Sequence, residues 1–201
     1  MFTGIIEYLG RVVSVDELGT GKIFWVESPL AEKLHVDQSL SHNGICLTVE
    51  DIKSGCHRVT AIRETLEKTN CGNWETGSLV NLERCLPASG RFDGHMVQGH
   101  IDCTGTCISR EDNTGSWLYR FSFPEKFAPL LIEKGSIAVN GISLTCFDVD
   151  KSSFSVAVIP YTFHYTNLFE IVPGSSVNLE FDLLGKYLLR KWSLDAEKDA
   201  Q

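Results

Sequence analysis

Short alternating runs of apolar and polar residues recur along the chain and predict a protein built almost entirely from β-strands. In its first half, these runs and the turn residues between them predict strands at residues 4–15, 22–27, 38–41, 45–51, 57–62 and 79–84. Helical signals are short: Ser28 and Pro29 mark the start of a helix reaching His35, and one helical turn is expected over residues 65–70. Short strands at this spacing are typical of an antiparallel barrel or sandwich.

The pattern occurs twice. The sequence NGICLT at residues 43–48 returns 97 residues later as NGISLT at residues 140–145. The sequence VNLE at residues 80–83 returns with the same offset, and the glycine and isoleucine spacing of the first strand returns with an offset of 95. A stretch rich in Pro, Gly and Ser at residues 86–94 separates the copies. The chain is therefore predicted to be a duplicated domain, with copies at residues 1–94 and 95–184.

Residues 185–201 lie outside the repeat. Leu184, Leu188, Leu189 and Trp192 share one face of a predicted helix, and a shorter helix is expected within the second copy at residues 124–134. A lone terminal helix must bury its apolar face. Packing against its own barrel and self-association are the two alternatives.

Composition limits the classes of function. The 201 residues are 43% hydrophobic and 22% charged, which is normal for a soluble globular protein. The net charge is −8 and the 18 basic residues form no dense block, so nucleic-acid binding is not expected. No apolar run approaches membrane-spanning length and the first residues lack signal-peptide character, so we expect a cytoplasmic protein without membrane contact.

The seven cysteines favour neither disulfides nor a metal. Their number is odd, no C-x-x-C occurs, and a cytoplasmic setting argues against a disulfide framework. Cys103, Cys107 and His100 resemble a zinc set, but on a strand His100 faces the side opposite to the two cysteines. We therefore expect ordinary thiols and no metal site.

The repeated stretch offers a small polar face. On a strand, Cys46 and Thr48 point away from the apolar Ile45 and Leu47, and the second copy presents Ser143 and Thr145 in the same way. The apolar face would fill a barrel, which leaves the polar face for a ligand. A duplicated hairpin without function is the alternative, because Asn-Gly is also a common turn signal.

The start of the second copy adds titratable chemistry. The sequence GHMVQGH at residues 94–100 contains two histidines and two glycines, and His100 corresponds to Ile5 of the first copy. Histidine titrates near neutral pH, and glycine permits close backbone approach. A buried structural histidine is the alternative. Two similar pockets that differ at polar positions suit two molecules of one ligand in two roles.

These motifs resemble the riboflavin synthase family of the alpha-chain type, a family of duplicated lumazine-binding barrels. The resemblance rests on MFTGIIE at residues 1–7, NGICLT at 43–48, GHMVQGH at 94–100 and NGISLT at 140–145, in this order. It extends from Met1 to about Asp182.

The resemblance implies an all-β fold of two tandem, similar six-stranded antiparallel Greek-key barrels plus a C-terminal α-helix. It implies a transferase that uses no cofactor and assembles as a homotrimer, with lumazine synthase as a further partner. Two molecules of 6,7-dimethyl-8-ribityllumazine would exchange a four-carbon unit to give riboflavin and 5-amino-6-(ribitylamino)uracil. Each active site would lie between the first barrel of one subunit and the second barrel of a neighbour.

The resemblance also implies two substrate pockets. The pocket of the first barrel would comprise Gly4, Ile5, Ile6, Ser39, Cys46, Leu47, Thr48, Thr60, Ala61, Ile62, Arg63, Glu64 and Thr65, joined by Gly99, His100 and Ile101. The pocket of the second barrel would comprise Lys134, Ser143, Leu144, Thr145, Ile159, Pro160, Tyr161, Thr162, Phe163, His164 and Asp182. Three positions depart from the family: Tyr161 and His164 stand where glutamates are frequent, and Asn140 replaces an aspartate of some members.

His100 is the expected proton-transfer group, and Cys46, Ser143 and Thr145 are expected to orient the rings or to add to an electrophilic carbon. Pairing two substrates could itself supply roughly 7–11 kcal/mol of the barrier. A lumazine- or flavin-binding antenna protein without activity is the nearest alternative. A cysteine hydrolase that uses Cys46 and His100 is another, although it leaves the second copy unexplained.

Overall fold

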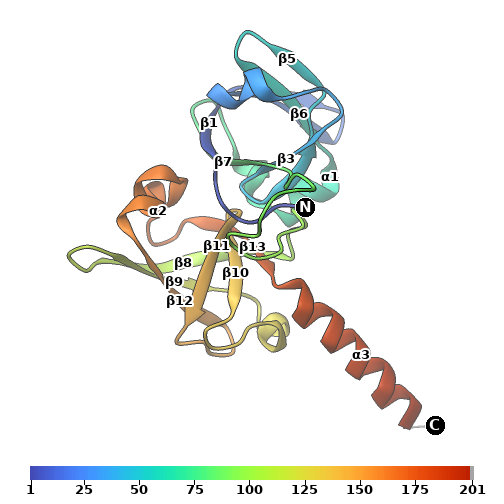
Figure 1. Cartoon of the computed structure of the whole chain (residues 1–201), viewed down its shortest axis with the longest axis vertical. Coiled ribbons are helices and arrows are strands. Elements are labelled where there is room, and N and C mark those ends of the chain that lie inside the picture. The colour runs from blue at the N-terminus through green and yellow to red at the C-terminus, as the bar shows by residue number, and fades with distance from the viewer. Residues whose placement is uncertain (200–201) are drawn as a thin grey trace.

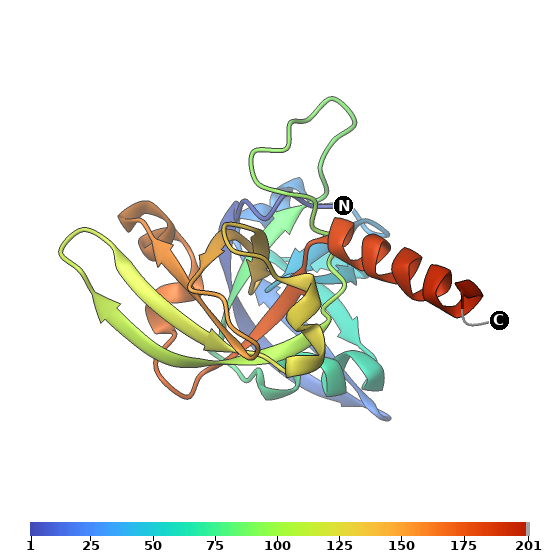
Figure 2. The same cartoon turned by 90° about the horizontal axis from the view of Figure 1, so that it is seen from below.

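The computed structural model describes residues 1–199 as two β-structured halves and a long helix that projects away from them (Figures 1 and 2). The N-terminal half contains β1 (Tyr8–Leu18), β2 (Gly21–Glu27), β3 (Ser39–His42), β4 (Ile45–Thr48), β5 (Asp51–Lys53), β6 (Cys56–Ala61) and β7 (Leu79–Arg84). The C-terminal half contains β8 (Cys103–Asp112), β9 (Trp117–Ser122), β10 (Ser136–Val139), β11 (Ile142–Phe147), β12 (Ser153–Val158) and β13 (Ser176–Phe181).

The strand order confirms the all-β fold built from a repeated unit. In the C-terminal half, β10-β11-β12-β9-β8-β13 closes into a six-stranded antiparallel barrel. The N-terminal half is a curled sheet of seven strands in the order β4-β3-β7-β1-β2-β6-β5. The two strand orders correspond if β4 and β5 are counted as one strand, because together they occupy the position that β11 holds in the C-terminal half.

Two expected strands differ in extent. The strand expected at residues 45–51 is divided, because Val49 N–H still bonds to Gln38 on the β3 side while Glu50 N–H bonds to Arg58 on the β6 side. The strand expected from residue 4 begins only at Tyr8, since Gly4 has a φ of +78° and the chain turns out of the sheet before it. The residues before Tyr8 therefore form a separate arm.

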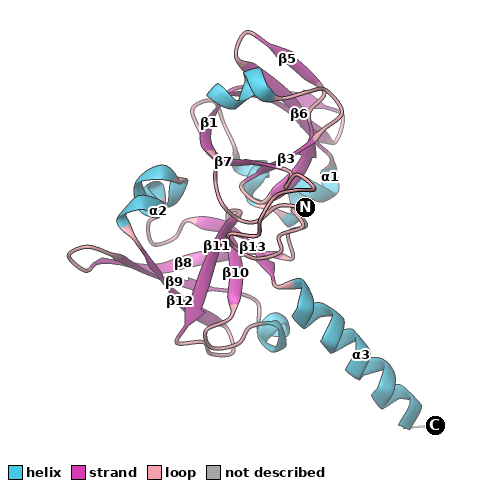
Figure 3. Cartoon of the chain, viewed as in Figure 1, coloured by secondary structure: helices cyan, strands magenta, loops and turns pink. Residues whose placement is uncertain are grey.

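The helices are short except the last (Figure 3). They are η1 (Pro29–Lys33), α1 (Arg63–Lys68), η2 (Asn70–Asn73), η3 (Glu125–Leu130), α2 (Pro160–Tyr165), η4 (Asn167–Glu170) and α3 (Leu183–Asp199), where η denotes a 3₁₀-helix. The expected helix after Ser28 is only a 3₁₀-turn, and the Ser28 side chain makes no capping hydrogen bond. The turn expected at residues 65–70 begins two residues earlier, as α1.

Each half has its own apolar core, and one pair of core positions holds histidines in only one of the halves. In the N-terminal half, His42 of β3 and His57 of β6 are fully buried with their Nε2 atoms 2.8 Å apart. Val139 and Phe154 hold the corresponding positions in the C-terminal half and are also fully buried. Burial lowers the pKa of both histidines, that of His57 to about 4, so the pair is neutral at neutral pH.

Six buried asparagines join the halves. They form three pairs at the offset of 97: Asn43 and Asn140, Asn70 and Asn167, Asn81 and Asn178. Their bonds repeat in both directions, since Asn70 N–H donates to Asn178 Oδ1 at 2.7 Å and Asn167 N–H donates to Asn81 Oδ1 at 2.8 Å. The Asn-Gly turns that sequence reasoning treated as hairpin signals are thus also the contact between the halves.

The C-terminal helix is tied to the barrel only near its start. Lys186 forms an ion pair with Asp102 at 2.6 Å, whereas Leu184, Leu188 and Trp192 are 73%, 54% and 66% exposed. The alternative in which this face packs against its own barrel is therefore wrong. None of the helices within residues 1–199 is both long and apolar enough to cross a membrane.

Candidate functional site: two crossed arms over two polar strands

Two equivalent arms, residues 1–6 and residues 96–101, cross between the halves. They pair with each other where Phe2 N–H donates to Val97 O at 2.7 Å and Val97 N–H donates to Phe2 O at 3.1 Å. Phe2 and Val97 are fully buried at this crossing. Each arm then continues onto the half to which it does not belong.

The contact of each arm is made at a glycine. Ser143 N–H of β11 donates to Gly4 O at 2.8 Å, and Cys46 N–H of β4 donates to Gly99 O at 2.9 Å. A Cβ at Gly4 would lie 2.6 Å from Ser143 Cβ, and a Cβ at Gly99 would lie 2.5 Å from Cys46 Cβ. Both glycines also have positive φ, so only glycine fits either contact.

The crossing corrects one grouping from the sequence. We expected Gly4 and Ile6 to line the pocket of the first half, but Gly4 lies on β11 and Ile6 packs against the core of the second half. Ile101 packs against the core of the first half, next to the Gly99–Cys46 contact. Sequence offsets could not reveal this exchange, because an arm has the same sequence whichever half it covers.

On the N-terminal half, the polar face expected around Cys46 is present. Cys46 is half-buried and Thr48 exposed, whereas Leu47 and Ala61 face the core and can offer a ligand only main-chain atoms. The other expected residues lie on β6, in the turn after it and on α1: Thr60, Ile62, Arg63, Glu64 and Thr65. The α1 residues form exposed ion pairs within the helix, between Arg63 and Glu67 and between Lys68 and Glu64.

The C-terminal half holds a hydrogen-bonded pair that sequence reasoning missed. His95 Nδ1 lies 2.7 Å from Ser143 Oγ, so the serine expected in the site is joined to the histidine immediately before the second arm. Burial lowers the pKa of His95, and the carboxylate of Asp182 acts in the opposite direction. The signal was available in GHMVQGH, which contains both histidines, but only the tertiary fold brings His95 rather than His100 to Ser143.

His100, the residue expected to transfer a proton, is exposed on the second arm. Its backbone N–H donates to Glu180 Oε2 at 3.0 Å, which fixes the main chain, and its side chain is exposed. The ring follows directly after the Gly99–Cys46 contact. One histidine of the segment 94–100 therefore contacts Ser143, and the other directly follows the glycine that contacts Cys46.

The segment after β12 gives the C-terminal half an aromatic surface. Tyr161 packs against Tyr165 in a tilted arrangement, with ring centroids 4.6 Å apart, and Phe163 stacks on Trp117 at 3.7 Å. His164 meets the edge of Trp117. The two surfaces thus differ in chemistry, since α1 carries ion pairs where α2 carries rings.

The remaining expected residues of this half are more dispersed. Leu144 is half-buried against the core, and Thr145, Ile159 and Pro160 are exposed, as is Lys134, whose ammonium lies 5.0 Å from the Phe147 ring centroid. Asp182 Oδ1 accepts a hydrogen bond from Leu184 N–H at the start of α3. Asn140, one of the three departures from the family, is buried between the halves and forms part of the asparagine contact.

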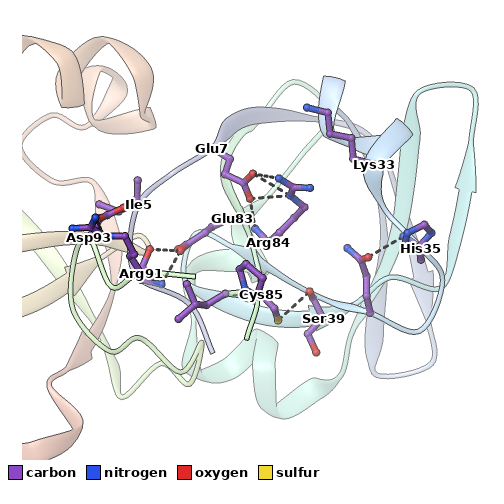
Figure 4. A pocket seen from close by; sticks show the side chains of 14 residues that line it. Ile5, Glu7, Lys33, His35, Ser39, Glu83, Arg84, Cys85, Arg91 and Asp93 are labelled. Carbon is purple, nitrogen blue, oxygen red and sulfur yellow. Dashed lines mark hydrogen bonds and ion pairs between the residues drawn. The ribbon is translucent and has the colours of Figure 1, made fainter. Parts of the chain in front are cut away.

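A cavity of about 540 Å³ lies over β3, β7 and residues 3–7 of the N-terminal half (Figure 4). Ile5 and Ser39 line it together with an ion pair in which Arg84 Nη2 lies 2.6 Å from Glu7 Oε2. Burial raises the pKa of Glu7, but the hydrogen bonds and charge of Arg84 outweigh burial and leave it below its usual value. Within residues 1–199, no three His, Cys, Asp or Glu side chains gather as a metal site would require.

Comparisons with known proteins agree with this arrangement. The chain matches the family described as "Lumazine binding domain" twice, over residues 3–85 and 98–182. It is 41% identical to riboflavin synthase from Actinobacillus pleuropneumoniae over 189 residues, which cover 94% of this chain and 88% of the relative. It is 38% identical to riboflavin synthase from Bacillus subtilis (strain 168), with coverages of 94% and 89%.

Solved structures share the fold. The chain superposes on LumP complexed with riboflavin with a TM-score of 0.84 at 21% identity, covering 90% of this chain and 99% of that one. LumP complexed with 6,7-dimethyl-8-(1'-D-ribityl) lumazine gives a TM-score of 0.82 at 20% identity, with the same coverages. The duplicated frame, the crossed arms and these matches together show that the chain belongs to the riboflavin synthase family of enzymes, built from two lumazine-binding domains.

Proposed function

We propose that this enzyme converts two molecules of 6,7-dimethyl-8-ribityllumazine into riboflavin and 5-amino-6-(ribitylamino)uracil. The observation that carries the proposal is a pair of surfaces that occupy corresponding positions in the two halves but carry different polar groups. One surface has Cys46 and His100, and the other has Ser143 and His95. One ligand that must act once as donor and once as acceptor needs two similar sites with different polar groups. The names of the relatives support the same reaction.

The proposed chemistry begins with removal of a proton from the C7 methyl group of one lumazine. The electron pair of the broken C–H bond is delocalised over the ring, and the resulting carbanion forms a C–C bond with the second lumazine. Two C–N bonds of that second lumazine then break, so that its four-carbon unit (C6, C7 and their methyl groups) passes to the deprotonated molecule. The deprotonated molecule becomes riboflavin, and the second lumazine, the donor, leaves as 5-amino-6-(ribitylamino)uracil. The atoms balance without an external oxidant. One lumazine supplies the four carbons that the other gains, and its nitrogens take up the hydrogens that the other loses.

His95 and His100 are the groups suited to move the proton. His95 is neutral at neutral pH because burial lowers its pKa, and its Nδ1 contact with Ser143 fixes the ring. His100 is exposed on an arm whose main chain is held by Glu180. Holding the two substrates as a bound pair contributes roughly 7–11 kcal/mol, more than a general base, whose typical effect is about 10²–10⁴-fold.

We also propose that the two lumazines meet between subunits of a homotrimer. The apolar face of α3 projects from the body without cover from its own barrel, which supports assembly through this helix. On each polar surface the cysteine or serine is half-buried and the following threonine, Thr48 or Thr145, is exposed, so a neighbouring copy would exclude water from them. The expected association with lumazine synthase remains part of this proposal.

The test is direct. The purified protein is mixed with 6,7-dimethyl-8-ribityllumazine alone, and lumazine absorbance and riboflavin fluorescence are followed together. We expect one riboflavin for every two lumazines consumed. Lumazine binding without new flavin would overturn the proposal and indicate a binding protein of the antenna class.

A further inference from the structure

Two buried carboxylates lie beneath the crossed arms. Glu83 of β7 and Glu180 of β13 occupy equivalent positions at the offset of 97 and are only 4% and 2% exposed. Neither forms an ion pair with a basic side chain within residues 1–199. A buried carboxylate without a cation requires hydrogen-bond donors, because desolvation of the charge is otherwise very unfavourable.

The donors come from the arms. Glu83 Oε1 accepts from Thr3 N–H and Thr3 Oγ1, both at 2.7 Å, and Oε2 accepts from Gly4 N–H at 3.0 Å. Glu180 accepts from the N–H groups of Gln98, Gly99 and His100 at 2.6, 2.9 and 3.0 Å. These N–H groups belong to arms outside the sheets, so each carboxylate provides the acceptor that a neighbouring strand would otherwise provide.

Through the arms, each carboxylate is connected to a strand of the opposite half. Gly4, held by Glu83 of the N-terminal half, presents its carbonyl to Ser143 of the C-terminal half. Gly99, held by Glu180 of the C-terminal half, presents its carbonyl to Cys46 of the N-terminal half. Only glycine fits these contacts, so the backbone of each arm lies directly against the strand beneath it. A small displacement of the arm would therefore lengthen and break the hydrogen bond between them.

We propose that Glu83 and Glu180 are positioning residues that act crosswise, so that each carboxylate fixes the polar surface of the half to which it does not belong. Glu180 sets the position of His100 over Cys46. Glu83 sets the position of Gly4 over Ser143, and therefore the environment of the His95–Ser143 pair. The effect on turnover rests on the proposed function, but the effect on the strands does not.

The experiment compares Glu83→Gln and Glu180→Gln in the full chain. Glutamine keeps the shape of glutamate, but its NH₂ group replaces one accepting oxygen with a donor that faces the N–H groups of the arm. Hydrogen exchange is followed by mass spectrometry in peptides that cover residues 45–48 and 142–147. E180Q is expected to accelerate exchange in the first peptide by about tenfold or more and to leave the second unchanged, and E83Q is expected to do the reverse.

Turnover of the ribityllumazine is expected to fall by about 100-fold in each variant, because a displacement of about 1 Å can have that effect. Glu75→Gln, a change at an exposed carboxylate, is the control and should alter neither peptide nor turnover. If either variant fails to fold, Glu83→Asp and Glu180→Asp replace it. Aspartate keeps the negative charge, but its side chain is shorter by one methylene group. We therefore expect a smaller acceleration of exchange, again in the peptide of the opposite half.

Faster exchange in both peptides, or mainly in the peptide of the altered residue's own half, would overturn crosswise positioning. A crossed exchange pattern with full turnover would overturn the functional part of the proposal. Absence of riboflavin from the wild-type protein would instead contradict the proposed reaction, and the exchange experiment would still decide whether the carboxylates hold the arms.

Discussion

At the residue scale, the molecule distinguishes two histidines that are only five positions apart. His95 is half-buried and its Nδ1 lies 2.7 Å from Ser143 Oγ, whereas His100 is exposed and its backbone N–H donates to Glu180. Burial favours the neutral imidazole of His95, which is the form that accepts a proton. His95 is therefore as strong a candidate for proton transfer as His100, the residue that the sequence favoured.

His95→Gln tests this assignment. Glutamine can still bond to Ser143 but cannot take up a proton, so kcat is expected to fall by about 100-fold or more with little change in lumazine affinity. Because burial lowers the pKa of His95, wild-type activity should persist to a lower pH than an ordinary histidine would allow and then decline on the acid side. Initial rates across pH and fluorescence titration of lumazine measure both effects. If H95Q retained full turnover while His100→Gln lost it, His100 would be the proton-transfer group.

At the element scale, the two halves have the same strand order but differ in the core side chains that two corresponding strands contribute. In the barrel of the C-terminal half, β10 and β12 contribute Val139 and Phe154 to an apolar core. In the N-terminal half, β3 and β6 contribute a buried histidine pair at these positions, and His57 Nδ1 has no hydrogen-bond partner within residues 1–199. This pair makes the N-terminal half the acid-sensitive one.

The expected loss of stability has a defined pH window. Unfolded histidine takes up a proton below about pH 6.5, whereas folded His57 does so only near pH 4. The unfolded state therefore binds more protons between these values, and stability should decrease as pH falls through this range, by up to roughly 3 kcal/mol from His57. Urea unfolding of the wild type at several pH values measures the decrease.

The double variant His42→Val with His57→Phe, which introduces the residues of the second half, is the matched comparison. It should be less sensitive to acid than the wild type over the same range. An unchanged difference between pH 7 and pH 4.5 would show that the pair does not control acid stability.

At the scale of the whole molecule, the asparagine contact and the crossed arms make the two halves one body, while α3 extends from it (Figure 1). Three of the exposed apolar residues of α3, at 184, 188 and 192, lie four positions apart and form one stripe. Such a stripe is suited to packing against the same helix of another copy.

Charge placed on the stripe tests assembly. Leu188→Glu combined with Trp192→Glu is expected to convert the oligomer into monomers in sedimentation, because charged side chains cannot be buried there without partners. Ser193→Glu places a charge on another side of the helix and should leave assembly unchanged. Monomeric wild-type protein, or a doubly substituted protein that still assembles, would contradict assembly through α3.

The repeat and the strand pattern were readable from the sequence because side-chain alternation is a local property. Cys46 and Thr48 face away from Ile45 and Leu47 as alternation predicts. The division of residues 45–51 into β4 and β5 was not readable, since it depends on a change of pairing partner at Val49. The late start of β1 was missed for a similar reason, because Gly4 leaves the sheet to reach the other half.

The sequence by itself determined the duplication, the β-rich class, and the stretches around Cys46 and Ser143 that carry the site. Only the tertiary structure decided which arm covers which half, which histidine meets Ser143, and that the Asn-Gly turns join the halves. The physical reason is that local alternation fixes the face on which a side chain lies. Contacts between residues far apart in the sequence, from 48 positions for His95 and Ser143 to 139 for Gly4 and Ser143, depend on hydrogen-bond donors and acceptors that only the folded chain brings together.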